Sequence, residues 1–162
     1  MAAIKFRIGY GYDVHPFKTG NYITLGGVKI PHKMGLKAHS DGDVVIHALV
    51  DALLGASALG DIGLHFPDTD ERWKNKDSRL FLQTTVQMLA KKNWNINNAD
   101  ITIIAETPKL RDYFEKMRIN LAKDMKIDLN QINVKATTTE KLGFTGRQEG
   151  IAVTAIALIQ AK

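Results

Sequence analysis

The segment from Val44 to Ala58 constrains the fold more than any other part of the sequence, because the helix that it predicts is apolar on almost every side. It is rich in Leu and Ala and stops at Gly60. A helix that is apolar on most faces is buried among other elements. The motif Ser40-Asp41-Gly42-Asp43 precedes it, so we expect Ser40 to cap this helix in a capping box. His47 and Asp51 interrupt the apolar run.

The rest of the chain alternates between strand-like and helix-like segments. Gly26-Gly27 separates two short apolar runs, which predicts a hairpin. Thr107-Pro108 has the form of a helix cap followed by proline at the first helical position. We expect strands at Ile4–Gly9, Tyr22–Leu25, Val28–Ile30, Ala99–Ala105, Ile132–Thr138 and Ile151–Gln160, helices at Ser78–Lys92 and after Thr107-Pro108, and a loop at Asp61–Trp73. Hairpin-linked strands argue against an all-parallel sheet, so we predict one α+β domain over residues 1–162 with a mixed β-sheet.

Composition excludes several classes of protein. A chain of 162 residues with 44% hydrophobic and 24% charged residues is typical of a folded domain. The absence of cysteine excludes a disulfide scaffold, a thiolate zinc finger, an iron–sulfur site and a cysteine nucleophile. The apolar stretch Ile151–Ile159 is too short to span a bilayer, and Lys5 and Arg7 in the first apolar run argue against a signal peptide. We therefore expect a cytoplasmic protein that does not bind membranes.

The net charge of +5 does not by itself predict a nucleic-acid partner. Basic residues are interleaved with acidic ones, as in Arg111-Asp112, which is typical of a solvated surface. We expect no nucleic-acid binding, and the small excess of positive charge favours a phosphorylated metabolite instead. The sequence also lacks a complete dinucleotide fingerprint, a phosphate-binding loop and a serine-hydrolase motif.

Asp13, His15 and His47 form the first candidate site. Asp13-Val14-His15 follows the first expected strand, and residues two apart in extended chain point the same way, so Asp13 and His15 can face one metal ion. With His47 they make three protein ligands and leave a fourth position open, as in catalytic zinc sites. The alternative is a chance Asp-x-His pair and a core histidine bonded to a carbonyl. Asp51, one turn after His47, is a candidate acceptor for its imidazole N–H, or it only solvates that helix face.

Two further segments carry groups suited to phosphate. His39-Ser40 precedes the buried helix, whose N-terminal N–H groups suit an anion, although Ser40 can also act only as a cap. The three hydroxyls of Thr137-Thr138-Thr139 can donate to phosphate oxygens, and Glu140 is a hard oxygen ligand suited to Mg²⁺ or Mn²⁺. Threonine runs are also plain strand formers. Arg147 can hold an anion or be solvated.

The loop between the two central helices is the last candidate. Asp61-Ile62-Gly63 and Phe66-Pro67-Asp68-Thr69-Asp70 place several acidic residues together. Their carboxylates can accept hydrogen bonds from polyol hydroxyls, or they can form Asx turns that shape the loop. His32 and His65 carry no motif, and we expect them to be surface histidines.

Together these segments resemble the 2-C-methyl-D-erythritol 2,4-cyclodiphosphate synthase family of the methylerythritol phosphate route to isoprenoids. The matching motifs fall in family order and cover nearly the whole chain. They are Gly11-Tyr12-Asp13-Val14-His15, His39-Ser40-Asp41-Gly42-Asp43, Asp51-Ala52-Leu53-Leu54-Gly55, Gly60-Asp61-Ile62-Gly63, Phe66-Pro67-Asp68-Thr69-Asp70 and Lys135-Ala136-Thr137-Thr138-Thr139-Glu140-Lys141-Leu142-Gly143-Phe144-Thr145-Gly146-Arg147. The last motif alone is highly specific.

The resemblance implies an assembly and a reaction. It implies a mixed sheet covered by helices on one side, in a homotrimer with active sites between neighbouring subunits. The implied substrate is 4-diphosphocytidyl-2-C-methyl-D-erythritol 2-phosphate, and the products are the 2,4-cyclodiphosphate and CMP. Some members of the family hold an isoprenoid diphosphate in the central channel of the trimer, and Phe144 and Arg147 match residues near it.

The family's functional positions map onto this sequence residue by residue. By motif match, Asp13, His15 and His47 hold Zn²⁺, and Glu140 ligates a second divalent cation, Mg²⁺ or Mn²⁺. His39 and Thr138 match positions assigned to transition-state stabilisation. The positions expected to bind substrate are Asp13, His15, His39, Ser40, Asp61, Ile62, Gly63, Phe66, Pro67, Asp68, Thr69, Asp70, Thr137, Thr138, Thr139, Glu140, Phe144 and Arg147, and those expected to bind the nucleotide are Ala105, Glu106, Thr107, Pro108, Lys109, Leu110 and Arg111. The chain departs from the family pattern at Tyr10, where histidine is frequent, and at Glu106-Thr107, which replaces a commoner glutamine-containing pair.

Overall fold

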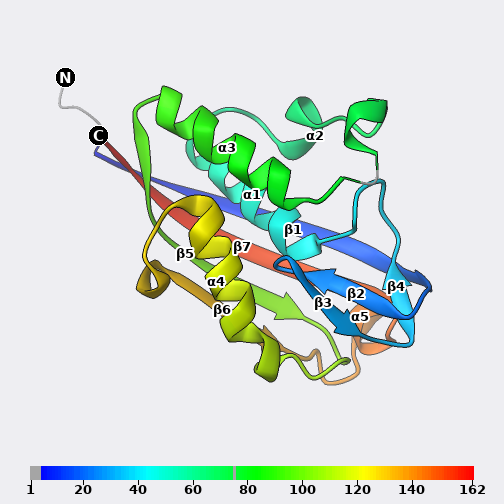
Figure 1. Cartoon of the computed structure of the whole chain (residues 1–162). Helices are drawn as coiled ribbons and strands as arrows, with labels where there is room; N and C mark the ends of the chain where they lie inside the picture. The colour runs from blue at the N-terminus through cyan, green and yellow to red at the C-terminus, as the bar shows by residue number, and fades with distance from the viewer. Residues whose placement is uncertain (1–4, 75) are drawn as a thin grey trace.

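A five-stranded mixed sheet runs through the centre of the molecule (Figure 1). The computed structural model describes residues 5–74 and 76–162. Its strands lie in the order β4-β1-β7-β5-β6, where only β5 and β6 are parallel. Their bounds are β1 Phe6–Thr19, β4 Met34–Leu36, β5 Trp94–Ile104, β6 Ile132–Thr137 and β7 Gly150–Ala161. The expected α+β domain with a mixed sheet is confirmed. Ile4, where we expected the first strand to begin, lies outside the described residues.

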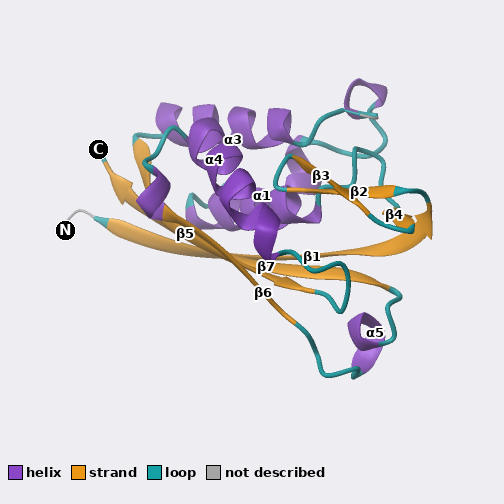
Figure 2. Ribbon diagram, turned by 60° about the horizontal axis from the view of Figure 1, so that its bottom comes forward, coloured by secondary structure: helices purple, strands orange, loops and turns teal. Residues whose placement is uncertain are grey.

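The three long helices lie on one side of this sheet (Figure 2). They are α1 Val44–Ala56, α3 Arg79–Lys91 and α4 Phe114–Met125. Helix α1 is buried along most of its length and lies directly on β1, because that strand has glycines where the two backbones meet. A Cβ on Gly9 would lie 1.8 Å from the carbonyl oxygen of Ala52, and one on Gly11 would lie 1.9 Å from that of Ala48. The sequence thus brings β1 and α1 into backbone contact.

A separate hairpin is held to the start of α1 by a buried carboxylate. Its strands, β2 Tyr22–Leu25 and β3 Val28–Pro31, confirm the predicted hairpin, and both glycines of the turn have positive φ. The side chain of Asp43, fully buried, accepts hydrogen bonds from the N–H groups of Gly26 (2.9 Å), Gly27 (2.6 Å) and Ile46 (3.1 Å). Asp43 is therefore the cap of α1.

The prediction that Ser40 caps this helix is wrong. Gly42 has a φ of +78°, so the chain leaves the helical conformation between Ser40 and the first turn of α1. Because the Asp43 carboxylate already lies at the N-terminus of α1, a phosphate placed there would face like charge.

Other element boundaries also differ from the expected ones. The first strand, expected to end at Gly9, continues to Thr19 because it stays paired with β7 and β4, and the strand expected from Ala99 already begins at Trp94. The helix expected after Thr107-Pro108 begins only at Phe114, because the chain first turns into the fold, where Leu110 is buried, and coils through a short 3-10 turn at Arg111–Tyr113. The expected loop Asp61–Trp73 contains the single turns α2 Ile62–His65 and Glu71–Trp73. Further short turns are Leu129–Gln131 and α5 Gly143–Gly146.

The sheet face opposite α1 carries large apolar side chains that remain exposed in the single chain. Because Gly9 and Gly11 face α1, the alternate residues of β1 point the other way. Tyr10 pairs with Ile156 on β7, and Ile8 is 72% exposed. The exposed large apolar residues of this outer sheet face are Phe6, Ile8, Tyr10, Tyr12 and Ile156. Among the described residues, no helix is both long and apolar enough to cross a membrane.

Candidate metal centre

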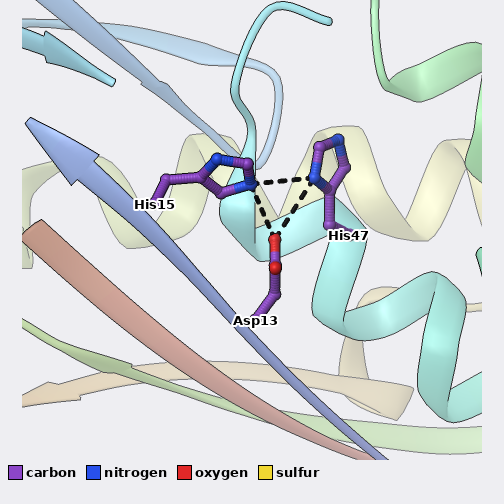
Figure 3. A group of neighbouring side chains, drawn as sticks. All are labelled: Asp13, His15 and His47. Atoms are coloured by element: carbon purple, nitrogen blue, oxygen red, sulfur yellow. Dashed lines mark hydrogen bonds and ion pairs between the residues drawn. The ribbon is translucent and has the colours of Figure 1, made fainter. Parts of the chain in front are cut away.

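Asp13, His15 and His47 converge at the contact between β1 and α1 (Figure 3). Asp13 and His15 point to the same side of β1, and His47 extends from the first turns of α1. Asp13 Oδ2 lies 2.8 Å from His15 Nε2 and 3.2 Å from His47 Nδ1, and the two nitrogens are 3.0 Å apart. The structure therefore brings together the three residues that the spacing singled out.

The outer nitrogen of His15 shows which of its ring nitrogens carries the proton, whereas that of His47 faces two serine hydroxyls. His15 Nδ1 lies 2.8 Å from the carbonyl oxygen of Lys37, which only accepts, so Nδ1 bears the proton. His47 Nε2 lies 2.9 Å from Ser78 Oγ and 3.1 Å from Ser40 Oγ. When both rings are neutral and His47 carries its proton on Nε2, Asp13 Oδ2 is buried without a hydrogen-bond donor. Three lone-pair groups then face one another, which is the donor set that a divalent cation requires.

The carboxylate and the His15 imidazole shift each other's pKa values. Burial alone would lower the pKa of His15, but the hydrogen bond and charge of Asp13 outweigh it and raise that pKa above its ordinary value. Burial likewise acts to raise the pKa of Asp13, but hydrogen bonds from the two imidazoles, when these carry a proton toward it, hold that pKa below its usual range. A cation bound by these atoms competes with protonation of the same ligands.

The metal centre opens into a cavity of about 690 Å³, here called the metal-side cavity. The polar residues lining it include His39 and Ser40, and His39 Nε2 lies 3.5 Å from Asp68 Oδ2 at the exposed rim. The cavity is lined by Val14, His15, Pro16, Lys37, Ala38, His39, Ser40, His47, Ile62, Gly63, Phe66, Pro67, Asp68, Trp73, Lys74 and Phe81. Two of the metal ligands, His15 and His47, line this cavity. Seven other residues that we expected to bind substrate line it too, namely His39, Ser40, Ile62, Gly63, Phe66, Pro67 and Asp68.

Asp61, Thr69 and Asp70 do not line this cavity. Asp61 Oδ1 accepts from the N–H of Leu64 (2.9 Å), and Asp70 Oδ1 accepts from the N–H of Arg72 (2.9 Å). These are the loop-shaping turns that we weighed as the alternative for this segment.

A second cavity, of about 590 Å³, lies at the ends of β5 and β6 and is here called the nucleotide-side cavity. It is lined by Ala105, Glu106, Pro108, Lys109, Leu110, Arg111, Asp112, Phe114, Ala136, Thr137 and Thr138. The expected nucleotide segment, apart from Thr107, therefore borders two of the three threonines. The two cavities share no lining residue.

The turn after β6 carries Glu140 in an unusual backbone conformation. Glu140 and Lys141 have positive φ values of 52° and 65°. Glu106 Oε1 accepts from the N–H groups of Thr139 (3.2 Å) and Lys141 (3.1 Å), which holds this turn in place. Thr138 Oγ1 donates to Glu140 Oε1 (3.1 Å). Glu140 is exposed and is not part of the group formed by Asp13, His15 and His47.

The last two candidates lie at α5. Phe144 is half-buried within α5, and the exposed Arg147 follows it. Arg147 Nε donates to Glu149 Oε1 (2.9 Å), so its guanidinium already has an acidic partner within this chain.

Three expectations from the sequence need correction: the hydrogen bond assigned to Asp51 and the surface positions assigned to His32 and His65. Asp51 does not accept from His47: its Oδ1 accepts from the N–H of Ile62 (2.7 Å), because the helix turns this carboxylate toward α2. His65 and His32 are half-buried rather than free surface groups. His65 Nε2 bonds to the carbonyl of Leu59 (2.7 Å), and His32 Nε2 lies 3.3 Å from Thr107 Oγ1.

Sequence reasoning missed Ser78, whose hydroxyl lies beside the outer nitrogen of His47. Only an expected helix start at Ser78 singled this residue out in the sequence, and it lies 31 residues from His47. No local pattern could have paired the two.

Comparison with known proteins gives consistent matches over nearly the whole chain. A profile of the YgbB family matches residues 6–160. A curated protein of Azotobacter vinelandii, named 2-C-methyl-D-erythritol 2,4-cyclodiphosphate synthase, is 61% identical over 96% of this chain and 99% of its own length. Among solved structures, IspF of Plasmodium falciparum in complex with CDP is 38% identical, with a TM-score of 0.86 over 99% of both chains. The bifunctional IspDF of Campylobacter jejuni is 45% identical, with a TM-score of 0.94, and this chain spans 43% of it.

Proposed function

The chain belongs to the YgbB family, and we propose from this membership which residue serves each step of the reaction. Its curated relatives are 2-C-methyl-D-erythritol 2,4-cyclodiphosphate synthases. The enzyme converts 4-diphosphocytidyl-2-C-methyl-D-erythritol 2-phosphate to the 2,4-cyclodiphosphate in isoprenoid precursor synthesis. An oxygen of the 2-phosphate attacks the β-phosphorus, the bond from that phosphorus to the CMP oxygen breaks, and CMP leaves.

The chemistry explains why the site offers metal ligands and donors rather than a nucleophile. The second pKa of a phosphate is near 6, so the attacking oxygen is already ionised and needs no general base. Attacker and electrophile are both negative, and repulsion between them is the main obstacle. A divalent cation, when bound, neutralises part of this charge. Asp13, His15 and His47 supply its ligands, and His39 at the rim donates toward phosphate oxygens.

The finer metal assignments belong to this proposal. We assign Zn²⁺ to Asp13, His15 and His47, because two imidazoles and one carboxylate with an open position are a common catalytic zinc set. We assign a second cation, Mg²⁺ or Mn²⁺, to Glu140, because a carboxylate suits a hard cation that keeps waters and phosphate oxygens. Thr138, hydrogen-bonded to Glu140, is placed to donate to the diphosphate during transfer.

We further propose that the working site forms between subunits of a homotrimer. The metal-side cavity and the nucleotide-side cavity of one chain share no lining residue. The diphosphate of one substrate molecule must nevertheless contact the residues of both kinds of cavity. The outer sheet face supplies an apolar surface for such an assembly, with Ile8, Tyr10 and Ile156 exposed together. Monomeric proteins rarely leave a large contiguous apolar patch in water.

The nucleotide end of the substrate is proposed to bind in the nucleotide-side cavity. A solved relative holds CDP, which shows that a family member takes a cytidine nucleotide. Ala105–Leu110 offers backbone groups at the end of β5, and Lys109 and Arg111 add positive charge. Phe144 and Arg147, at α5, are proposed to border the central channel and to meet an isoprenoid diphosphate there. A cytoplasmic location of the protein remains a prediction from the sequence.

The convergence of Asp13, His15 and His47 carries this assignment, and product analysis tests it. The purified protein with Zn²⁺ and Mg²⁺ should release CMP and the cyclic diphosphate in equal amounts, as measured by mass spectrometry. In H₂¹⁸O the products should contain no solvent oxygen, whereas a metal-dependent phosphohydrolase would incorporate it. His47→Ala should lose bound zinc and activity together while remaining folded. Saturable nucleotide binding without any CMP release would instead identify a non-catalytic binding protein and overturn the assignment.

A further inference from the structure

A partly buried chain of hydrogen-bonded polar groups lies behind His47, on the side away from the metal centre. Ser78 Oγ lies 2.9 Å from His47 Nε2 and donates to Asp41 Oδ1 at 2.5 Å. The backbone N–H of Ser78 also donates to Asp41, at Oδ2 (3.2 Å). Ser40 Oγ lies 3.1 Å from the same His47 nitrogen and 3.3 Å from Ser78 Oγ. Asp41 and Ser78 come from segments 37 residues apart, so this contact joins the loop before α1 to the start of α3.

The side chain of Ser78 does not cap the helix that it precedes. It stands at the N-cap of α3, where a serine side chain normally accepts from the first free N–H groups of the helix. Its hydroxyl makes no such bond, and Asp77 Oδ1 accepts from the N–H of Arg79 (2.9 Å) instead. Ser78 is fully buried. Its hydroxyl is therefore committed to His47 and Asp41.

The direction of these hydrogen bonds fixes the tautomer of His47. A carboxylate only accepts, so the hydroxyl proton of Ser78 lies toward Asp41. The oxygen of Ser78 then has lone pairs for His47, and Nε2 must bear the ring proton. Nδ1 is left with its lone pair, and Nδ1 is the atom that faces Asp13 and His15.

We propose that Ser78 and Asp41 are positioning residues for metal binding: they hold His47 in the tautomer and ring orientation that present Nδ1 to the cation. The inference rests on the cation site proposed above and adds two residues to it. Groups that orient a metal-bound histidine through its other nitrogen typically contribute about 10–100-fold in metal affinity. Neither Ser78 nor Asp41 touches the cation or the substrate in this arrangement.

Metal affinity of the purified apoprotein tests the proposal without reference to turnover. We measure Zn²⁺ binding by competition with a chromogenic chelator for Ser78→Ala, Asp41→Asn and the double variant. Each single variant should bind Zn²⁺ about 10–100-fold more weakly. The double variant should be little worse than either, because both substitutions break one chain of hydrogen bonds. Ser78→Thr keeps the hydroxyl and should recover most of the affinity.

Ser57→Ala is the matched control for a lost buried hydroxyl. Ser57 is buried at the other end of α1, where its Oγ donates to the carbonyls of Leu53 and Leu54. The substitution costs stability without touching His47, so Zn²⁺ affinity should stay unchanged. Thermal unfolding of each apoprotein separates lost metal affinity from lost structure.

The tautomer itself provides a second readout that does not depend on Ser78→Ala folding. In the apoprotein with neutral His47, ¹⁵N chemical shifts should place the ring proton on Nε2. In Asp41→Asn the amide can donate to Ser78, so the Ser78 hydroxyl can turn its proton toward His47 and the Nδ1–H form should become populated.

Zn²⁺ affinity within twofold of the unsubstituted protein in both single variants, or an unchanged tautomer in Asp41→Asn, would overturn the proposal. If the affinities follow the expected order while no protein releases CMP from the substrate, the assigned reaction fails and the positioning role stands.

Discussion

Replacing Gly11 by alanine should separate β1 from α1 and damage the metal centre from a distance. The added Cβ would lie 1.9 Å from the carbonyl oxygen of Ala48, and non-bonded contacts of this kind below 3.0 Å essentially do not occur. The obstacle is backbone, so no side chain can rotate away. The strand and the helix must therefore move apart by about 1 Å at this point.

That displacement acts on both stability and metal binding. Overpacking of a close contact costs about 1–3 kcal/mol in the free energy of unfolding. Metal–ligand distances tolerate only about 0.2 Å, and Asp13 and His15 lie on the strand while His47 lies on the helix. We therefore expect Gly11→Ala to lower Zn²⁺ affinity by roughly tenfold or more, since a shift of this size exceeds what the ligands can absorb.

Gly55→Ala is the matched control on the same helix. Nothing lies within 4 Å of a Cβ added at Gly55, so this substitution should stabilise the protein by about 0.5–1 kcal/mol, as expected for alanine in place of glycine in a helix. Urea unfolding gives the free energies, and chelator competition gives the Zn²⁺ affinities. A Gly11→Ala protein that matches the unsubstituted protein in both measurements would refute the argument that backbone contact sets the geometry of the centre.

Three further substitutions test other parts of the structure. Glu140→Gln should leave Zn²⁺ bound but raise the Mg²⁺ or Mn²⁺ concentration needed for half-maximal turnover, and an unchanged metal titration would contradict its role. Asp43→Asn should lower the free energy of unfolding by about 1–3 kcal/mol, because the amide keeps one acceptor oxygen and turns an NH2 group toward the N–H that the other carboxylate oxygen accepted from; an unchanged urea midpoint would argue against this. Ile156→Glu places a charge on the outer sheet face and should shift sedimentation toward the monomer, whereas an unaltered oligomer would exclude this face as the interface.

Local patterns in the sequence predicted several features of the fold. The pair Gly26-Gly27 predicted a hairpin because only glycine adopts two successive positive φ values easily. The apolar run from Val44 predicted a buried helix because no face of it could remain in water. Asp13 and His15 were expected on one side of a strand because side chains alternate along it. In each case, the deciding interaction lies within a few residues.

Features that depend on distant contacts could not be predicted. Asp51 was the predicted partner of His47, but Ser78 lies beside it instead, and that contact depends on where α3 begins relative to α1. The capping-box pattern predicted Ser40 as the cap of α1, whereas the cap is Asp43. Gly42 between them has a positive φ, and the Asp43 side chain also accepts a hydrogen bond from the hairpin turn. The outer sheet face had the alternation of a half-buried strand, but alternation does not say what covers it.

The two cavities of each chain share no lining residue, and this has a genetic consequence. A substitution at His47 damages one cavity, and a substitution at Glu140 damages the turn beside the other. In a trimer that pairs unlike cavities across each interface, two inactive chains mixed together would restore complete sites wherever their undamaged halves meet. Two different null alleles in one cell should then complement each other, while either allele alone stays inactive.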